Sequence, residues 1–215
     1  MFINWHGQSC FKLVGDKTTV ITDPFDNSIG LRAPRLAGDI VTISHDHGDH
    51  NNVEGVKGLN QTEPFIIKGP GEYEYKNVFV YGIASFHDNE RGAKRGTNII
   101  YRIEIDGITI THLGDLGHLL ENEQLEKIEG TDILLIPVGG DYTIDGKQAT
   151  KIISELEPRI VIPMHYRLPG LKVKIDGLDT FCKEIGVCPK EELPKFKITK
   201  KDLPQEDLQV VLLQP

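Results

Sequence analysis

The sequence predicts an α/β (α+β) fold, in which β-sheets carry helices on their outer faces. Short runs rich in β-branched residues, each bounded by Gly, Pro, Asn or Asp, follow one another through the first half of the chain. Two later runs, at residues 132–137 and 159–165, are almost continuously apolar, which is typical of strands buried on both faces. Helical patterns accompany these runs, so we expect a β-α-β-α-β order in the second half.

The strands of the first half are predicted from residue composition and from their bounding turn residues. They cover residues 2–5, 11–15, 18–23, 39–44, 64–69, 78–86, 98–105 and 108–113. The last two strands are joined by Asp106 and Gly107, a dipeptide that favours a two-residue hairpin turn. The stretch LQVVLL, residues 208–213, is expected to add edge structure, either within a sheet or against another chain.

Three helices are expected to cover these strands. Leu120, Leu125 and Ile128 share one helical face within residues 117–130. Residues 145–158 carry an apolar stripe that ends at a proline, and residues 176–187 carry another that ends near a glycine. No repeat or linker divides the chain, so its 215 residues are expected to form one domain or two tightly fused halves.

The charge of the chain limits its partners. The formal net charge is −8, and the basic pair Lys94 and Arg95 is too short for a nucleic-acid footprint. We therefore expect a small-molecule substrate and no nucleic acid. The chain contains no apolar run of about eighteen residues and no secretory signal at its start, which predicts a cytoplasmic protein without a membrane span. The oligomeric state does not follow from the sequence.

The three cysteines, Cys10, Cys182 and Cys188, form no C-x-x-C pair and are odd in number. Such a set does not indicate a disulfide framework or a zinc knuckle. We expect three thiols in a reducing compartment, buried or incidental to the fold.

A cluster of metal-binding side chains lies in residues 43–52, ISHDHGDHNN, directly after an expected strand. The cluster comprises His45, Asp46, His47, Asp49 and His50. In a turn beyond a strand, His45 and His47 can converge on one ion, whereas Asp49 and His50 can reach a neighbouring ion. Imidazole suits Zn, Fe, Mn or Ni, and carboxylate oxygen suits the harder of these. The alternative is a solvated polar loop, but such loops use turn-forming residues rather than three imidazoles.

Further potential ligands stand at the ends of other expected strands. His87, Asp115 and His165 each follow or end such a strand, where functional loops are commonly built. A carboxylate shared between two ions would hold them about 3.5–4 Å apart, the usual separation in two-metal hydrolases. Asp115 is the candidate for this bridge.

With this order of motifs, the sequence resembles the metallo-β-lactamase superfamily. The motifs are Asp23 in VITDPF, His45-x-His47-x-Asp49-His50, His87, Asp115 in HLGDLGH and His165 in IPMHY. WHGQSCF and LLIPVGGDYTID resemble the small single-domain branch with lactonase-like and phospholipase D-like hydrolases, which often has a histidine where Gln8 stands. The resemblance implies a single hydrolase domain over residues 1–215, an αββα sandwich of two mixed β-sheets flanked by helices.

The resemblance also implies a dinuclear site and assigns its ligands. The first metal would be bound by His45, His47 and His87, the second by Asp49, His50 and His165, and both by Asp115. Asp23 would buttress the metal loop without binding a metal. The implied cofactors are two divalent ions, Zn²⁺ in the first place, with Mn²⁺, Fe²⁺ or Ni²⁺ as alternatives.

Histidines on either side of Asp115 have different expected roles. His112 is expected to hold a metal ligand in place. His118 could donate a hydrogen bond to a substrate oxyanion or phosphoryl oxygen, or could lie at the surface where a helix starts. His6 is expected to be structural and Asp46 to face solvent or support the site, while Tyr142 and Thr143 are candidates for the pocket wall.

The expected reaction is hydrolysis of an ester, a lactone or a phosphodiester. Two divalent ions lower the pKa of a shared water from about 15.7 toward 7, which supplies hydroxide at neutral pH. Asp49 would hold this hydroxide and carry its proton to the leaving group, so Asp49 and His118 are the catalytic candidates.

Three other functions remain open on the same scaffold. They are nucleic-acid processing by a nuclease, metal binding or ligand sensing without turnover, and di-iron redox chemistry. The acidic charge disfavours the nuclease. The resemblance disfavours redox chemistry, because the di-iron branches place a carboxylate at the position of His47 and usually attach a flavin-binding module.

Overall fold

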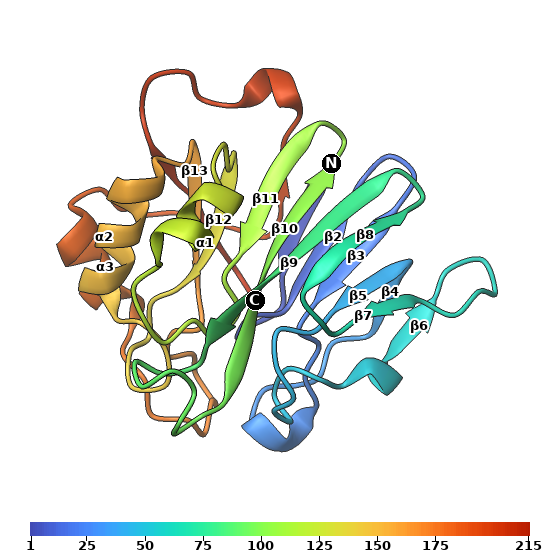
Figure 1. Cartoon of the computed structure of the whole chain (residues 1–215), viewed down its shortest axis with the longest axis horizontal. Coiled ribbons are helices and arrows are strands. Elements are labelled where there is room, and N and C mark those ends of the chain that lie inside the picture. The colour runs from blue at the N-terminus through green and yellow to red at the C-terminus, as the bar shows by residue number, and fades with distance from the viewer.

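Two β-sheets lie face to face in the computed structural model, which describes residues 1–215 (Figure 1). The first sheet has the strand order β15-β1-β2-β3-β5-β7. Its strands are β1 (Phe2–Trp5), β2 (Phe11–Val14), β3 (Thr19–Thr22), β5 (Ile40–Thr42), β7 (Phe65–Ile67) and β15 (Phe196–Lys197). The pairs from β15 to β3 are antiparallel, and β3, β5 and β7 are parallel, so the sheet is mixed.

The second sheet is also mixed and has the order β16-β13-β12-β11-β10-β9-β8. Its strands are β8 (Gly71–Tyr75), β9 (Val78–Phe86), β10 (Thr97–Ile105), β11 (Ile108–His112), β12 (Ile133–Pro137), β13 (Ile160–Met164) and β16 (Gln209–Val210). Strands β8 to β11 pair antiparallel, and β11, β12, β13 and β16 pair parallel. The predicted hairpin is confirmed, since Ile105 pairs with Ile108 across the Asp106-Gly107 turn.

The α-helices cover the outer side of the second sheet, beside β12 and β13 (Figure 1). They are α1 (Asn122–Lys127), α2 (Gly146–Leu156) and α3 (Leu178–Ile185). All residues of β12 and β13 are buried, as their continuous apolar sequence predicted, because helices lie on one face and the first sheet on the other. The longest helix, α2, has 11 residues, so no helix has the length and apolar character needed to cross a membrane.

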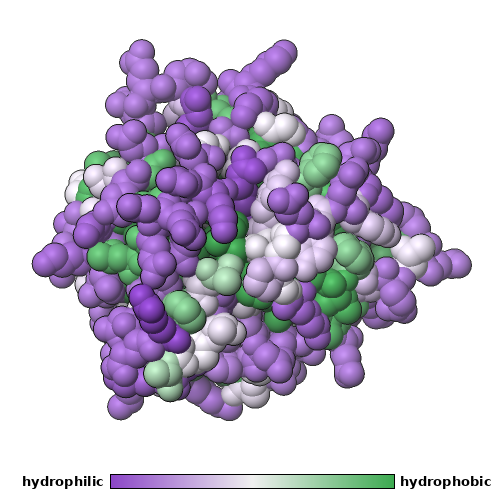
Figure 2. All heavy atoms as spheres, in the orientation of Figure 1, coloured by the Kyte–Doolittle hydropathy of each residue, from purple (hydrophilic) through white to green (hydrophobic).

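Short elements, and no α-helix, lie on the outer face of the first sheet. They are the 3₁₀ turns η1 (Asn27–Ile29) and η2 (Val53–Gly55) and a two-stranded ribbon of β4 (Leu36–Gly38) and β6 (Val56–Gly58). A separate cluster of 8 buried residues, which includes Ile29 and Val56, packs under them. The main core of 44 buried residues lies between the sheets and under the helices. Hydrophilic residues cover most of the face seen in Figure 2, with apolar residues in small separate patches.

The predicted helix over residues 117–130 is wrong at its start. The helix α1 begins only at Asn122, where Glu121 and Gln124 form a capping box. The residues before it belong to a loop that carries Asp115. The C-terminal stretch was predicted as edge structure, and β16 pairs with β13 at the edge of the second sheet while β17 (Leu212–Leu213) pairs with β14 (Glu192–Leu193). The remaining short element is the 3₁₀ turn η3 (Lys200–Asp202).

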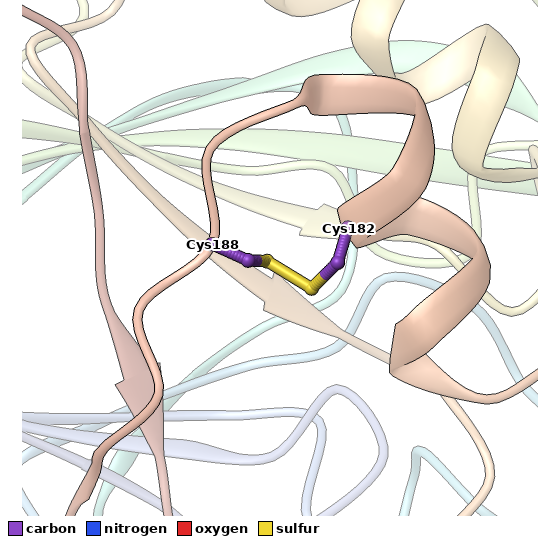
Figure 3. Close-up of a disulfide and its surroundings, with 2 residues drawn as sticks. All are labelled: Cys182 and Cys188. Carbon is purple, nitrogen blue, oxygen red and sulfur yellow. A yellow bond between two sulfur atoms is a disulfide. The ribbon is translucent and has the colours of Figure 1, made fainter.

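The expectation of three free thiols is wrong for two of them. Cys182 and Cys188 form a disulfide, with their Cα atoms 5.4 Å apart (Figure 3). Cys182 lies in α3, and Gly186 ends that helix with a left-handed φ of 73°, so the chain turns back toward the helix. A C-x₅-C spacing does not reveal this turn. Cys10 remains a thiol, and its burial raises its pKa, which makes it unreactive.

Candidate metal centre

The predicted ligands meet at one edge of the sandwich because they follow strands of both sheets. The segment 45–50 follows β5 of the first sheet, whereas His87, Asp115 and His165 follow β9, β11 and β13 of the second sheet. Strands β11 and β13 run parallel, so their carboxyl ends deliver Asp115 and His165 to the same side. The structure therefore brings together all seven residues that the resemblance assigned to two metals.

One carboxylate oxygen lies at the centre of four imidazoles. Asp115 Oδ2 is 3.2 Å from His165 Nε2 and 3.3 Å from His50 Nε2. It is 3.4 Å from His87 Nε2 and 4.0 Å from His45 Nε2. Two ligands held about 2.0–2.2 Å from a common ion at ordinary coordination angles are about 3–3.5 Å apart. The spacing around Asp115 thus fits a carboxylate shared between ions on either side.

Three groups of side chains offer ligand atoms that lie within 4.8 Å of one another. They are His45, His47 and His87; His45, His50 and Asp115; and Asp49, His50 and His165. The first group is the predicted set for one ion and the third is the predicted set for the other. Asp115 belongs to the group between them, which agrees with a bridging position.

A buried carboxylate orients two of the histidines. Asp23 accepts hydrogen bonds from the Ser44 amide at 2.7 Å and the Ser44 hydroxyl at 2.6 Å, and its Oδ2 lies 3.1 Å from His50 Nδ1. Because the Ser44 proton goes to Asp23, the hydroxyl oxygen accepts from His45 Nδ1 at 2.9 Å. Both imidazoles therefore direct Nε2 at the site, and the buttress role expected of Asp23 has this physical form.

Asp115 is fixed by groups around it. Ser9 Oγ donates to its Oδ1 at 3.1 Å, and its backbone N–H donates to Asn98 Oδ1 at 2.9 Å. The buried ring of His112 contacts the Ser9 carbonyl at 2.8 Å and accepts from the Gly114 N–H at 3.2 Å. The His112 ring therefore connects the segment that contains Ser9 with the Gly114 backbone, and both positions fix Asp115. The roles of Ser9 and Asn98 were missed, because single polar residues in a sequence carry no sign of their partner.

The charges of the site are strongly coupled. Burial opposes ionisation of Asp115, yet the imidazoles of His165 and His50 hold its pKa well below the usual range. Burial likewise opposes protonation of His50, but the carboxylates of Asp115, Asp23 and Asp49 raise its pKa well above the usual value. Burial and the neighbouring His50 lower the pKa of His45 to about 3, so His45 is neutral and available as a ligand.

The chemistry of these donors fits divalent metal ions. The Nε2 atoms of His45 and His50 are buried without a hydrogen-bond partner, which is costly unless another group binds them. Imidazole nitrogens and carboxylate oxygens together suit Zn²⁺ and the neighbouring transition metals.

His118 does not join this site. Its Nε2 accepts from the Phe86 N–H at 3.1 Å, so its Nδ1 donates to the Leu119 carbonyl at 2.7 Å. Both ring nitrogens are used by the backbone, and the geometry gives no support to the prediction that His118 donates to a substrate. Asp46 is exposed and accepts from Asn51 at 2.6 Å, outside the ligand set.

The ligands open into a cleft of about 310 Å³. Besides His47, Asp49, His87, Asp115 and His165, its wall contains Lys94, Arg95, Tyr142 and Val173. The Arg95 guanidinium lies over the Tyr142 ring, 4.8 Å from its centroid. An adjoining hollow shares Asp49 and Tyr142 and adds Lys172 and Lys174. The expected wall position of Tyr142 thus agrees with the structure, and Thr143 lines a further hollow beside it.

The loop that carries Lys94 and Arg95 is folded around a single carboxylate. Asp88 Oδ1 accepts from the N–H groups of Glu90 and Gly92, each at 2.8 Å. Its Oδ2 accepts from the backbone N–H groups of Lys94 at 2.9 Å and Arg95 at 2.7 Å. The backbone of the two basic residues is therefore fixed beside the cleft, although the Lys94 side chain is 62% exposed.

Comparison with known proteins agrees with this geometry. The family model described as a Beta-lactamase superfamily domain matches residues 2–165. A UPF0173 metal-dependent hydrolase of Thermoplasma acidophilum is 30% identical over 185 residues, which cover 76% of this chain and 82% of that protein. Its counterpart in Thermococcus onnurineus is 31% identical over 188 residues, which cover 76% of this chain and 84% of that protein.

Solved structures show the same fold over the whole chain. A crystal structure from Thermotoga maritima, assigned to the Zn-dependent hydrolases of the metallo-β-lactamase superfamily, superposes with a TM-score of 0.80 and 35% identity. The match covers 99% of both chains. The two mixed sheets, the clustered ligands and these relatives lead to one conclusion: the chain belongs to the metallo-β-lactamase superfamily and is one of its metal-dependent hydrolases.

Proposed function

We propose that this protein is a dinuclear hydrolase that cleaves an ester, lactone or phosphodiester bond of a small molecule, with Zn²⁺ as the favoured metal. The observation that supports two ions is the number of donors around Asp115 Oδ2, since four imidazole nitrogens lie 3.2–4.0 Å from it and the seven donors form three overlapping groups. A tetrahedral zinc site takes four ligands, so seven donors are more than one such ion needs.

The bound ions and the residues around the cleft have different roles in the proposed reaction. Bound divalent ions supply activated water at neutral pH and polarise the substrate oxygen. Asp49 faces both the ligands and the open cleft, since its Oδ2 is 3.4 Å from His50 Nε2 and its side chain is 24% exposed. Partial burial opposes ionisation of Asp49, but the His50 imidazole lowers its pKa, so Asp49 is a carboxylate and can accept a hydrogen bond. Its position at the cleft, and not its pKa, supports a role in carrying a proton to the leaving group.

The walls of the cleft favour a substrate that carries negative charge. Arg95, Lys172 and Lys174 form none of the ion pairs of the structure, although the chain as a whole has a net charge of −8. Lys94 instead pairs with Glu90. Cations kept without carboxylate partners at a cleft raise the local concentration of anions. Among the three bonds this supports a phosphodiester or an ester with a nearby carboxylate.

A combined metal and activity measurement tests this proposal. The chelator-stripped protein is refilled with Zn²⁺, and the bound metal is counted by atomic emission. Hydrolysis of a neutral aryl ester, a lactone and bis(4-nitrophenyl) phosphate is then measured for the wild type, Asp49→Ala and the control Asp46→Ala. We expect two ions per chain, hydrolysis by the wild type and the control, and a loss of about 100-fold or more in Asp49→Ala.

Two outcomes contradict the proposal in different ways. A stoichiometry below two ions rejects the dinuclear site. Stoichiometric metal without turnover of any of these substrates supports metal binding or sensing, the alternative that the sequence left open. Full activity of Asp49→Ala removes this residue from the proton path.

A further inference from the structure

We propose that Gln8 is an additional ligand, through its side-chain oxygen, for the ion bound by Asp49, His50 and His165. This inference rests on the proposed two-metal site and concerns a residue from the opposite end of the chain. Gln8 lies in the turn between β1 and β2 and is fully buried, although glutamine is usually exposed. A buried amide aimed at a metal site needs a partner there.

The backbone of Gln8 is fixed in an uncommon conformation. Gln8 has a left-handed φ of 47°, and His165 has a left-handed φ of 51°. The Gln8 carbonyl accepts hydrogen bonds from Trp5 Nε1 at 2.8 Å and from the His165 N–H at 3.2 Å. Left-handed backbone at non-glycine residues persists where the surroundings impose it, often at functional sites. Here it directs the Gln8 and His165 side chains toward each other.

The distance between the two side chains is the distance between two ligands of one ion. The terminal nitrogen of the Gln8 amide lies 3.2 Å from His165 Nε2. The two proposed ligand pairs of His50, with Asp115 Oδ2 and with Asp49 Oδ2, measure 3.3 and 3.4 Å. A Zn²⁺ ion with nitrogen at about 2.0–2.1 Å and oxygen at about 2.0–2.2 Å requires this same spacing.

The oxygen of the Gln8 amide is the atom that can bind. An imidazole nitrogen that binds a metal has no lone pair left for an amide N–H, so the contact with His165 Nε2 cannot persist in the loaded site. Gln8 Oε1 is buried and has no hydrogen-bond partner. A half-turn of the amide group therefore breaks no hydrogen bond of the oxygen. It places Oε1 where the nitrogen now lies, 3.2 Å from His165 Nε2.

An amide oxygen would change the character of this ion relative to its neighbour. The first ion would have three imidazoles and the bridging carboxylate, whereas the second would have two carboxylates, two imidazoles and a neutral oxygen. Carbonyl and carboxylate oxygens suit harder ions, so the second site should accept Mn²⁺ or Fe²⁺ more readily than the first.

Metal titration tests this assignment without reference to turnover. The metal-free wild type, Gln8→Leu and Gln8→Glu are titrated with Zn²⁺ against a chromogenic chelator, and with Co²⁺ by visible absorption. Leucine keeps the approximate volume of the side chain and removes the oxygen, whereas glutamate keeps an oxygen at the same reach. We expect Gln8→Leu to weaken one of the two ions about 10- to 100-fold and to change the Co²⁺ absorption, with the other ion unaffected. Gln8→Glu should retain both ions.

The outcomes separate this inference from the proposed function. Equal affinities and Co²⁺ spectra in the wild type and Gln8→Leu overturn the ligand role of Gln8 while leaving the two-metal site in place. A role in packing alone predicts the reverse pattern, with Gln8→Leu tolerated and Gln8→Glu disruptive. A wild type that binds no ion overturns both proposals. Thermal unfolding of the metal-free variants checks their fold, and Gln8→Asn, which keeps the amide but shortens its reach, should weaken the same ion as Gln8→Leu.

Discussion

Asp23 Oδ2 lies 3.1 Å from His50 Nδ1, and both side chains are completely buried. The same carboxylate accepts from the amide and the hydroxyl of Ser44. A single residue at the end of β3 therefore sets the orientation of His50 directly and that of His45 through Ser44. One ligand of each proposed ion depends on Asp23, although Asp23 faces neither.

Asp23→Asn should weaken metal binding while leaving every ligand in place. Asparagine is nearly isosteric, but its NH₂ group cannot accept from His50 Nδ1, so the imidazole loses the partner that fixes its tautomer. We expect affinity for Zn²⁺ to fall about 10- to 100-fold in a chelator competition assay. Asp46→Asn, an exposed change in the neighbouring loop, is the control. Unchanged affinity in Asp23→Asn would show that His50 keeps its orientation without this carboxylate.

Tyr101→Phe should loosen the contact between the two sheets. Tyr101 on β10 shares its hydroxyl proton between the carbonyl of Ile43, directly after β5, at 2.7 Å and that of Ile67 in β7 at 3.1 Å. The Ile67 carbonyl also accepts from the Ile43 N–H at 2.9 Å, so the substitution leaves the Ile43 carbonyl unpaired. Loss of such a buried hydrogen bond costs about 1–2 kcal/mol in the free energy of unfolding. Denaturant unfolding at pH 7 measures this, with Tyr81→Phe on the neighbouring strand as the control.

The same tyrosine predicts how stability depends on pH at the alkaline end. Burial raises the pKa of Tyr101 above its ordinary value of 10.0, so the folded state favours the protonated hydroxyl. The contribution is fully present below pH 10 and is lost as the pH rises toward the folded-state pKa, because the unfolded chain ionises first. The wild type should lose stability above pH 10 more steeply than Tyr101→Phe. Parallel curves for the two proteins would contradict this.

Arg95→Gln should discriminate between anionic and neutral substrates. Arg95 lies over Tyr142 at the mouth of the cleft and has no carboxylate partner, so its charge is available to a substrate. We expect KM for an anionic substrate to rise about 5- to 10-fold, or roughly 1–1.4 kcal/mol, with little change for a neutral ester. Salt added to the wild type should raise the same KM. Lys127→Gln on α1 is the control, and an equal effect on both substrates would reject the anion preference.

Removal of the disulfide should lower stability without touching the site. The bridge closes a short loop, with a sequence separation of 6 between Cys182 and Cys188. Loop entropy gives about 2 kcal/mol for a loop of this size, which corresponds to a melting temperature lower by about 4–8 °C. Calorimetry of the Cys182→Ser and Cys188→Ser variants measures this. Since neither cysteine lines the metal cleft, metal binding should be unchanged.

Much of the fold could be predicted because the residue patterns of strands can be recognised in a single sequence. The apolar runs at β12 and β13 and the Asp106-Gly107 turn carry local signals, and the structure confirms them. The strand β8 was missed, because GEYEY is polar and mostly exposed and so lacks the composition of a buried strand. The early start predicted for α1 was wrong because Leu120 packs in the core from a loop as well as it would from a helix.

The site was predictable to the extent that its ligands recur at strand ends. His45, His87 and Asp115 share that position in the sequence, whereas their partners depend on contacts between distant segments. Ser9 meets Asp115 across 106 positions, and Gln8 meets His165 across 157. Likewise, the backbone partners that occupy His118 are invisible until the loop is folded.

The placement of ligands on both sheets has a consequence for synthesis of the chain. His45, His47, His87 and Asp115 have all been translated once the chain has passed residue 115, just after β11, so a growing chain then contains the donors proposed for the first ion. The second ion also needs His165, which follows β13 and contacts Gln8 near the start. A growing chain can therefore complete the second set of donors only after about three quarters of its residues have been made.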